Sequence, residues 1–223
     1  MVDRYSAYKA MAQVKQGNVV LVFCWAHVRR DFITVGKGWP EHKEWALAWL
    51  RRIRELYRHH RQRRISQAGG AEFVAADAEL RQTVAAMQAQ ADAEWADPKL
   101  PTPCRKVLAS LQEHWDGLTR FLDDSRIPLD NNASERQIRG PALGRKNYYG
   151  SGALWSGRLA AMLFSLFATL TMAKINIRTW LTWFLESCAA NGGQVPADIN
   201  PFLPWTMSEE KRRALALDPD DSS

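Results

Sequence analysis

Two acidic residues, Asp3 and Glu135, stand where a carboxylate could do chemistry. Asp3 comes directly before a segment with helical spacing, and Glu135 falls in the first turn of a helix predicted after the motif NNAS. Carboxylates on rigid elements can grip Mg²⁺ or Mn²⁺ for phosphoryl transfer, because these cations take hard oxygen ligands and leave room for a substrate phosphate. The spacing also allows a structural reading, in which Asp3 caps a helix and Glu135 pairs with Arg139.

Cys24 and His27 have the spacing of half a metal site. No second ligand pair follows at short spacing, and Cys24 ends an apolar run where cysteine behaves as a small hydrophobe. A metal-binding and a structural role therefore both stay open for this pair. The three cysteines are few, odd in number and far apart, which excludes a disulfide scaffold and indicates a reducing compartment.

Basic and aromatic side chains follow Glu135 along the chain. The protein carries 30 Lys and Arg against 24 Asp and Glu, a net charge of +6, which favours a polyanionic partner. A second basic segment, residues 51–64, holds seven arginines and one glutamate. Bases interleaved with aromatics suit a DNA backbone and a stacked base, and a solvated charged face is the alternative. The residues assigned to DNA are Arg136, Arg139, Arg145, Lys146 and Asn147, followed by Tyr148 and Tyr149.

The first half of the chain predicts two kinds of structure. Residues 1–40 read as α/β, because a helical segment is followed by the apolar run VVLVFCW at 19–25, which has the length of a strand covered on both faces. Residues 41–125 carry three apolar stripes at helical spacing. The stripes predict three helices that pack together, with breaks at Gly69-Gly70 and at the proline-rich stretch 97–103.

The second half predicts a return to mixed structure over residues 126–205. A short strand is expected at 127–129, then a helix at 133–139 that Gly140-Pro141 ends, and then an apolar helix at 156–173. A final amphipathic helix carries Trp180 to Leu185, and residues 206–223 form a tail that ends in an acidic, disordered DPDDSS.

The apolar run Leu159–Ala173 is the most hydrophobic part of the chain. Its fifteen residues fall short of the roughly 18–20 that a membrane span needs, so we expect a buried helix and no membrane partner. The opening MVDRYSAYKA lacks the apolar region of a signal peptide. We therefore expect a cytoplasmic protein.

Three segments together resemble the transposases of the insertion sequence 66 family. They are DRYSAY at 3–8, CWAHVRRDF at 24–32 and LDNNASERQIRGPALGRKNYYGSG at 129–152. The third segment is long and specific. With the helical block and the apolar C-terminal part, the resemblance covers nearly the whole chain to about residue 205.

The resemblance implies a DDE transposase with a ribonuclease H-like fold. The expected class is α-rich α/β, a truncated RNase H-like core interrupted by a helical insertion. The implied activity is Mg²⁺- or Mn²⁺-dependent DNA cleavage and strand transfer. Motif matching gives Asp3 the place of the second acid and Glu135 that of the third, both as divalent-metal ligands. Cys24 and His27 match a C-x-x-H pair of such insertions. The implied partners are transposon-end DNA and a second copy or other transposase subunits, and the implied location is the cytoplasm, bacterial-type and associated with the nucleoid.

The resemblance also implies a first acid on a strand before Asp3, and only Met1 and Val2 precede Asp3 in this sequence. Asp31 and Asp130 are the nearest other acids, and neither has the motif context to replace it. Two carboxylates would leave one metal under-ligated, so we expect the isolated chain to be inactive. The alternatives are a non-catalytic DNA-binding or regulatory remnant, and a poorly folding product that exposes 19–25 as an apolar edge.

Overall fold

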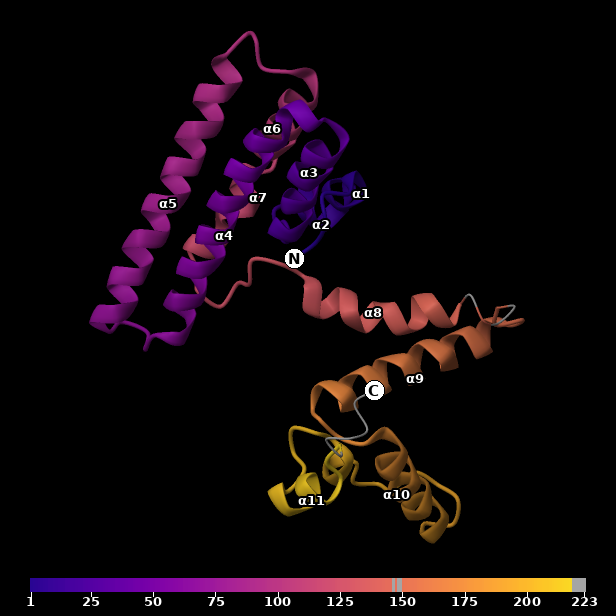
Figure 1. Ribbon diagram of the computed structural model, residues 1–223. Coiled ribbons are helices and arrows are strands. Elements are labelled where there is room, and N and C mark those ends of the chain that lie inside the picture. The colour runs from indigo at the N-terminus through magenta and orange to yellow at the C-terminus, as the bar shows by residue number, and fades with distance from the viewer. Residues whose placement is uncertain (146, 148–149, 218–223) are drawn as a thin grey trace. The chain divides into compact units, whose positions relative to one another are not determined.

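The computed structural model describes residues 1–145, 147 and 150–217, and these form helices joined by turns and loops (Figure 1). The chain divides into two compact units, Met1–Ser134 and Glu135–Ser223. Each unit has a hydrophobic core of its own. The elements in chain order are α1 Ser6–Ala10, α2 Ala12–Lys15, α3 Trp25–Gly38, η1 Pro40–His42, α4 Lys43–Ile65, α5 Ala71–Ala96, α6 Thr102–Glu113, α7 Trp115–Thr119, η2 Arg120–Leu122, α8 Asn132–Gly144, α9 Leu154–Met172, α10 Ile177–Ala190, η3 Asn200–Phe202 and α11 Glu209–Ala214.

The predicted α/β class with a truncated RNase H-like core is wrong. Within the described residues, β-type pairing is limited to two isolated bridges, Val2 with Phe23 and Ile175 with Ala216, and neither extends into a strand. The short strand expected at 127–129 is also absent. The described part of the chain is therefore all-helical.

The apolar run 19–25 shows why the strand prediction failed. Its backbone hydrogen bonds are made to two separate segments. The N–H of Phe23 donates to the carbonyl of Gly117 at 3.1 Å, and the N–H of Trp25 donates to the carbonyl of Leu129 at 2.9 Å. A ladder needs one partner strand along its length, and here Phe23 and Trp25 bond to two different segments of the chain. The run is also not covered throughout, because the exposed fraction of Val20 is 63%.

The first unit is built on α4 and α5, two long helices that lie side by side (Figure 1), with α3 and α6 packed against them. The three helices predicted for residues 41–125 are present as α4, α5 and α6. Their apolar stripes form the core together with the buried side of α3, where Phe32 stacks on Trp49 with ring centroids 5.1 Å apart. Aromatic pairs of this kind add about 0.5–1.5 kcal/mol beyond their buried area.

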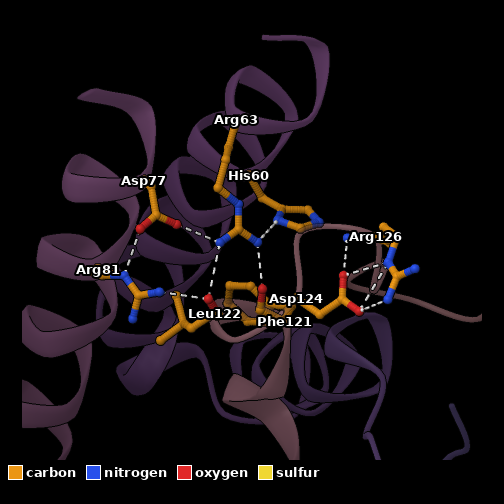
Figure 2. A network of polar contacts seen from close by, with 8 residues as sticks. All are labelled: His60, Arg63, Asp77, Arg81, Phe121, Leu122, Asp124 and Arg126. Atoms are coloured by element: carbon orange, nitrogen blue, oxygen red, sulfur yellow. Dashed lines mark hydrogen bonds and ion pairs between the residues drawn. The ribbon is translucent and has the colours of Figure 1, made fainter. Parts of the chain in front are cut away.

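A buried arginine fixes α4 against α5 and η2, as Figure 2 shows. Arg63 is 1% exposed, and its guanidinium donates to Asp77 Oδ1 at 2.7 Å and to the carbonyl oxygen of Phe121 at 2.5 Å. Arg81 donates to the other oxygen of Asp77 at 2.7 Å and to the carbonyl of Leu122 at 2.7 Å. The network satisfies polar groups at the end of η2 and sets the rotation of α4 about its axis.

The second unit has a smaller core around Trp180 of α10. The indole Nε1 of Trp180 donates to the carbonyl of Phe202 at 2.9 Å, and its ring stacks on Phe184 with centroids 5.3 Å apart. The turn between α9 and α10 places Lys174 at φ 58°. The predicted apolar helix and final amphipathic helix are thus present as α9 and α10. The acidic stretch 218–223 lies outside the described residues.

The expectation that the apolar helix is buried is wrong for α9. Only Leu170 is buried, while Leu154 and Trp155 are 73% and 71% exposed. The core of this unit contacts the C-terminal turns of α9, so the rest of the helix has no apolar cover within the unit. By length and composition α9 is the one helix in the described residues that could span a membrane, with mean hydropathy 1.3, and a single such helix is weak support for a membrane.

Candidate nucleic-acid interface

Asp3 lies in a turn that leads into α1. Its Oδ1 accepts the backbone N–H of Tyr5 at 3.1 Å, which is the bond of an Asx turn. The next residue, Arg4, anchors this turn to the helices behind it, because it pairs with Asp31 of α3 and donates to Ser110 Oγ of α6 at 2.8 Å. Asp3 is half-buried.

Glu135 lies in the first turn of α8, as the sequence predicts, and is half-buried. Asp3 belongs to the first unit and Glu135 to the second, so each is described with its own neighbours. The described residues contain no group of three or more His, Cys, Asp or Glu that could hold a metal ion. Neither carboxylate therefore sits in a cluster that would by itself supply the shell of Mg²⁺.

The predicted DNA-binding residues follow Glu135 on exposed chain. Arg136 and Arg139 are three residues apart on α8, which places them on one side of the helix, and α8 has no buried residue. Arg145 and Asn147 come after the helix end and are also exposed. Lys146, Tyr148 and Tyr149 lie outside the described residues.

The predicted end of this helix at Gly140-Pro141 is wrong, because α8 continues through Pro141 to Gly144. A proline disfavours the helical conformation of the residue before it, through contact of its Cδ with that residue's N–H and Cβ. Residue 140 is a glycine, so the Cβ part of this contact is absent. The helix then continues normally, since the N–H of Arg145 donates to the carbonyl of Pro141 at 3.0 Å.

Cys24 and His27 lie at the start of α3. Cys24 is fully buried at the N-cap, and His27 is half-buried one turn into the helix. A structural zinc site needs four ligands, and no third His, Cys, Asp or Glu joins these two among the described residues. The pair as described does not fit zinc, and its metal role stays a prediction.

A cleft of about 550 Å³ opens between α3, α4 and the segment before α8. Its apolar floor includes Leu47, Leu50 and Ile53. Its charged and polar lining residues are Arg29, Arg51, Arg54, Tyr57, Asp130 and Asn132. The cleft therefore combines three guanidinium groups with one carboxylate over an apolar base.

The single carboxylate of the cleft is already engaged. Asp130 Oδ2 accepts the hydroxyl of Tyr57 at 3.1 Å, and Oδ1 accepts the backbone N–H of Asn132 at 3.1 Å. Burial and the neighbouring Asp130 raise the pKa of Tyr57 well above its ordinary value, which keeps the phenol protonated as a donor. The arginines consequently dominate the field in the cleft, and their chemistry suits an anionic group such as a phosphate.

The cleft brings together motifs that are far apart in the sequence. Arg29 comes from the segment 24–32, and Asp130 and Asn132 come from the segment 129–152. Sequence reasoning did not find this site, and it passed over Asp130 as an acid without motif context. The signal that could have found it is the spacing of Arg51 and Arg54 with Tyr57, three residues apart along one side of a helix.

A comparison with protein families places the chain among transposases. The family described as Transposase IS66 family matches residues 1–159. The chain therefore belongs to the IS66 transposase family, as the three motifs predicted.

The relatives of the chain are longer proteins. It is 31% identical over 220 residues to the uncharacterized protein y4jD of Sinorhizobium fredii (strain NBRC 101917 / NGR234), which is 94% of this chain and 41% of that protein. It is 29% identical over 219 residues to the uncharacterized protein y4qI of the same strain, which is 94% of this chain and 39% of that protein. The chain thus spans about 40% of the length of the curated relatives it matches. No solved structure matches it.

Proposed function

We propose that this chain is a DNA-binding segment of an insertion-sequence transposase. The observation that carries the proposal is that two family motifs, one with Arg29 and one with Asp130 and Asn132, meet at an arginine-lined cleft. Phosphate contacts from arginines position a protein on DNA without regard to sequence. The exposed bases Arg136 and Arg139 of α8 supply a second set of phosphate contacts.

The reaction proposed for the family is DNA cleavage and strand transfer at transposon ends. In that reaction a divalent metal, Mg²⁺ or Mn²⁺, supplies the activation of the attacking oxygen. We propose Asp3 and Glu135 as the carboxylates of this chain that take part. Since the described residues form no metal-binding cluster, we derive no step through the metal.

The partners we propose are transposon-end DNA and a second copy or other transposase subunits. The place of action would be the cytoplasm, at the nucleoid. A non-catalytic role, in which the chain only occupies DNA, is the second candidate. Two observations favour this second candidate. The basic cleft is present, and the described residues contain no carboxylate cluster that could hold a metal.

The test of the DNA-binding proposal uses the full chain and a labelled duplex that carries the element's ends. We expect wild-type protein to bind the duplex, and Arg136→Gln/Arg139→Gln to bind it about tenfold more weakly, since each lost phosphate contact removes about 1 kcal/mol or less. The double variant Lys99→Gln/Lys106→Gln is the matched control, because it removes two exposed charges elsewhere. A wild-type chain that binds no DNA would refute the proposal.

The test of catalysis is nicking of supercoiled DNA with the element's ends in the presence of Mn²⁺. Glu135→Gln is the informative variant, because it keeps the size of the side chain and removes its charge. Nicking by wild type that disappears in Glu135→Gln supports a catalytic carboxylate. Binding without nicking by either protein supports the non-catalytic role.

A further inference from the structure

Five exposed arginines form a row along α4. Their positions repeat every three or four residues, which keeps them on one side of the helix. The row extends about 20 Å at 1.5 Å per residue. Its members are Arg51, Arg54, Arg58, Arg61 and Arg64, and we call them the arginine row.

A second hollow continues the cleft along this row. It has a volume of about 360 Å³ and is lined by His60, Arg61, Arg64 and Ile65 together with residues 128–130. Tyr57 and Asp130 line both this hollow and the first cleft. The two hollows therefore adjoin along α4 at the hydrogen-bonded pair Tyr57 and Asp130, and we call the two hollows together the groove.

Most of the positive charge of the arginine row is available to a ligand. Glu55 is the one acid within the row, and its carboxylate is held by Arg58 at 2.7 Å and lies 3.9 Å from Arg54. Arg51, Arg61 and Arg64 make no ion pair within the described part of the chain. The groove consequently has a strongly basic side and few anionic competitors.

The orientation of the row is fixed by buried contacts of α4. Arg63 points toward α5 and η2, as Figure 2 shows, where it bonds to Asp77 and to the carbonyl of Phe121. His60, which also lines the second hollow, packs edge-on against the ring of Phe121 with centroids 5.2 Å apart. Because these contacts set the rotation of α4, the arginine row is preorganised along the groove rather than free to turn away.

We propose that this groove binds a single DNA strand, with phosphates on Arg51, Arg61 and Arg64 and an unpaired base over the apolar floor beside Tyr57. The inference rests on the proposed function and names the form of DNA that this site takes. Two features favour a single strand over a duplex. The hollows have the volumes of small-ligand pockets, and their apolar floor suits base faces that only an unpaired strand exposes.

The experiment measures the affinity of the full chain for a labelled single strand of about 16 nucleotides at several salt concentrations. Arg61→Gln/Arg64→Gln should weaken binding at least about tenfold and lower the slope of log K against log salt by about 1.4, since each lost phosphate contact contributes about 0.7 for single strands. Lys99→Gln/Lys106→Gln, which loses the same charge away from the groove, should keep the wild-type slope. An unlabelled duplex should compete less well than an unlabelled single strand.

A slope unchanged in Arg61→Gln/Arg64→Gln, or equal competition by duplex, would overturn the inference. A measurement on the wild-type chain removes any dependence on folding of the variant: photo-crosslinking to a strand that carries bromodeoxyuridine should label residues 47–65 or 127–132, and labelling confined to other segments would also overturn it. If the α8 variants weaken duplex binding while the groove fails these tests, the proposed function stands and this inference falls. If the wild-type chain binds no DNA, both fall.

Discussion

Replacing Arg63 by methionine should destabilise the first unit more than any single surface change on α4. Arg63 is 1% exposed and bonds to Asp77 and to the carbonyl of Phe121 (Figure 2). Breaking a buried ion pair costs about 3–5 kcal/mol, and a buried carbonyl left without a donor adds about 1–3 kcal/mol. Asp77 keeps its bond to Arg81 and is 22% exposed in its side chain, which lowers the total. We expect a loss of about 3 kcal/mol.

The assay is urea unfolding of the full chain, followed by tryptophan fluorescence and circular dichroism. Arg64→Met is the matched control, because Arg64 is the exposed neighbour on the same helix and its replacement should change the free energy of unfolding by about 0.5 kcal/mol or less. A free energy of unfolding for Arg63→Met within about 1 kcal/mol of the wild-type value would refute this prediction. It would mean that the Arg63 network does not hold α4 to η2.

Three further predictions concern pH, packing and thiol chemistry. Burial and the nearby arginines lower the pKa of His60 from 6.5 to about 4. As the pH falls from 6.5 to 4, the unfolded chain therefore binds a proton at His60 before the folded chain does, and the free energy of unfolding should fall by at most about 3 kcal/mol. Urea titrations at several pH values should show this contribution in wild type and not in His60→Gln. Gly117→Ala would place a Cβ 2.5 Å from the ring of a neighbouring phenylalanine and should cost about 1–3 kcal/mol in thermal unfolding, whereas Gly38→Ala, with open space at its Cβ, should cost far less. Burial raises the pKa of the Cys104 thiol to about 11, so iodoacetamide at neutral pH should modify the half-buried Cys188 first, and equal rates by mass spectrometry would contradict this.

The helices of the first unit could be predicted from the sequence because their apolar residues repeat with the helical period. The stripe that includes Leu80, Val84 and Met87 is buried on α5 as its spacing indicates. The sheet could not be excluded in the same way. An apolar run such as 19–25 has the composition of a strand whether or not a partner strand exists, and its actual partners, the carbonyls of Gly117 and Leu129, are about a hundred residues away.

The candidate site was predicted only in part. Exposed bases on α8 follow from the polarity of that segment, and the family follows from the motifs. The cleft depends on the contact of Tyr57 with Asp130, which are 73 residues apart, and no local pattern encodes such a contact. The exposed start of α9 was missed because hydrophobicity alone does not tell whether a helix has apolar neighbours to cover it.

The claim that the cleft holds DNA is tested most directly by the salt dependence of binding to a labelled single strand of about 16 nucleotides, for wild type and for Arg29→Gln/Arg51→Gln. Both arginines line the cleft, and each lost phosphate contact should lower the slope of log K against log salt by about 0.7 for single strands. We predict binding that weakens steeply with salt and a slope lower by about 1.4 in the double variant. Binding that does not change with salt, or a variant with the wild-type slope, would contradict the claim that this cleft holds DNA.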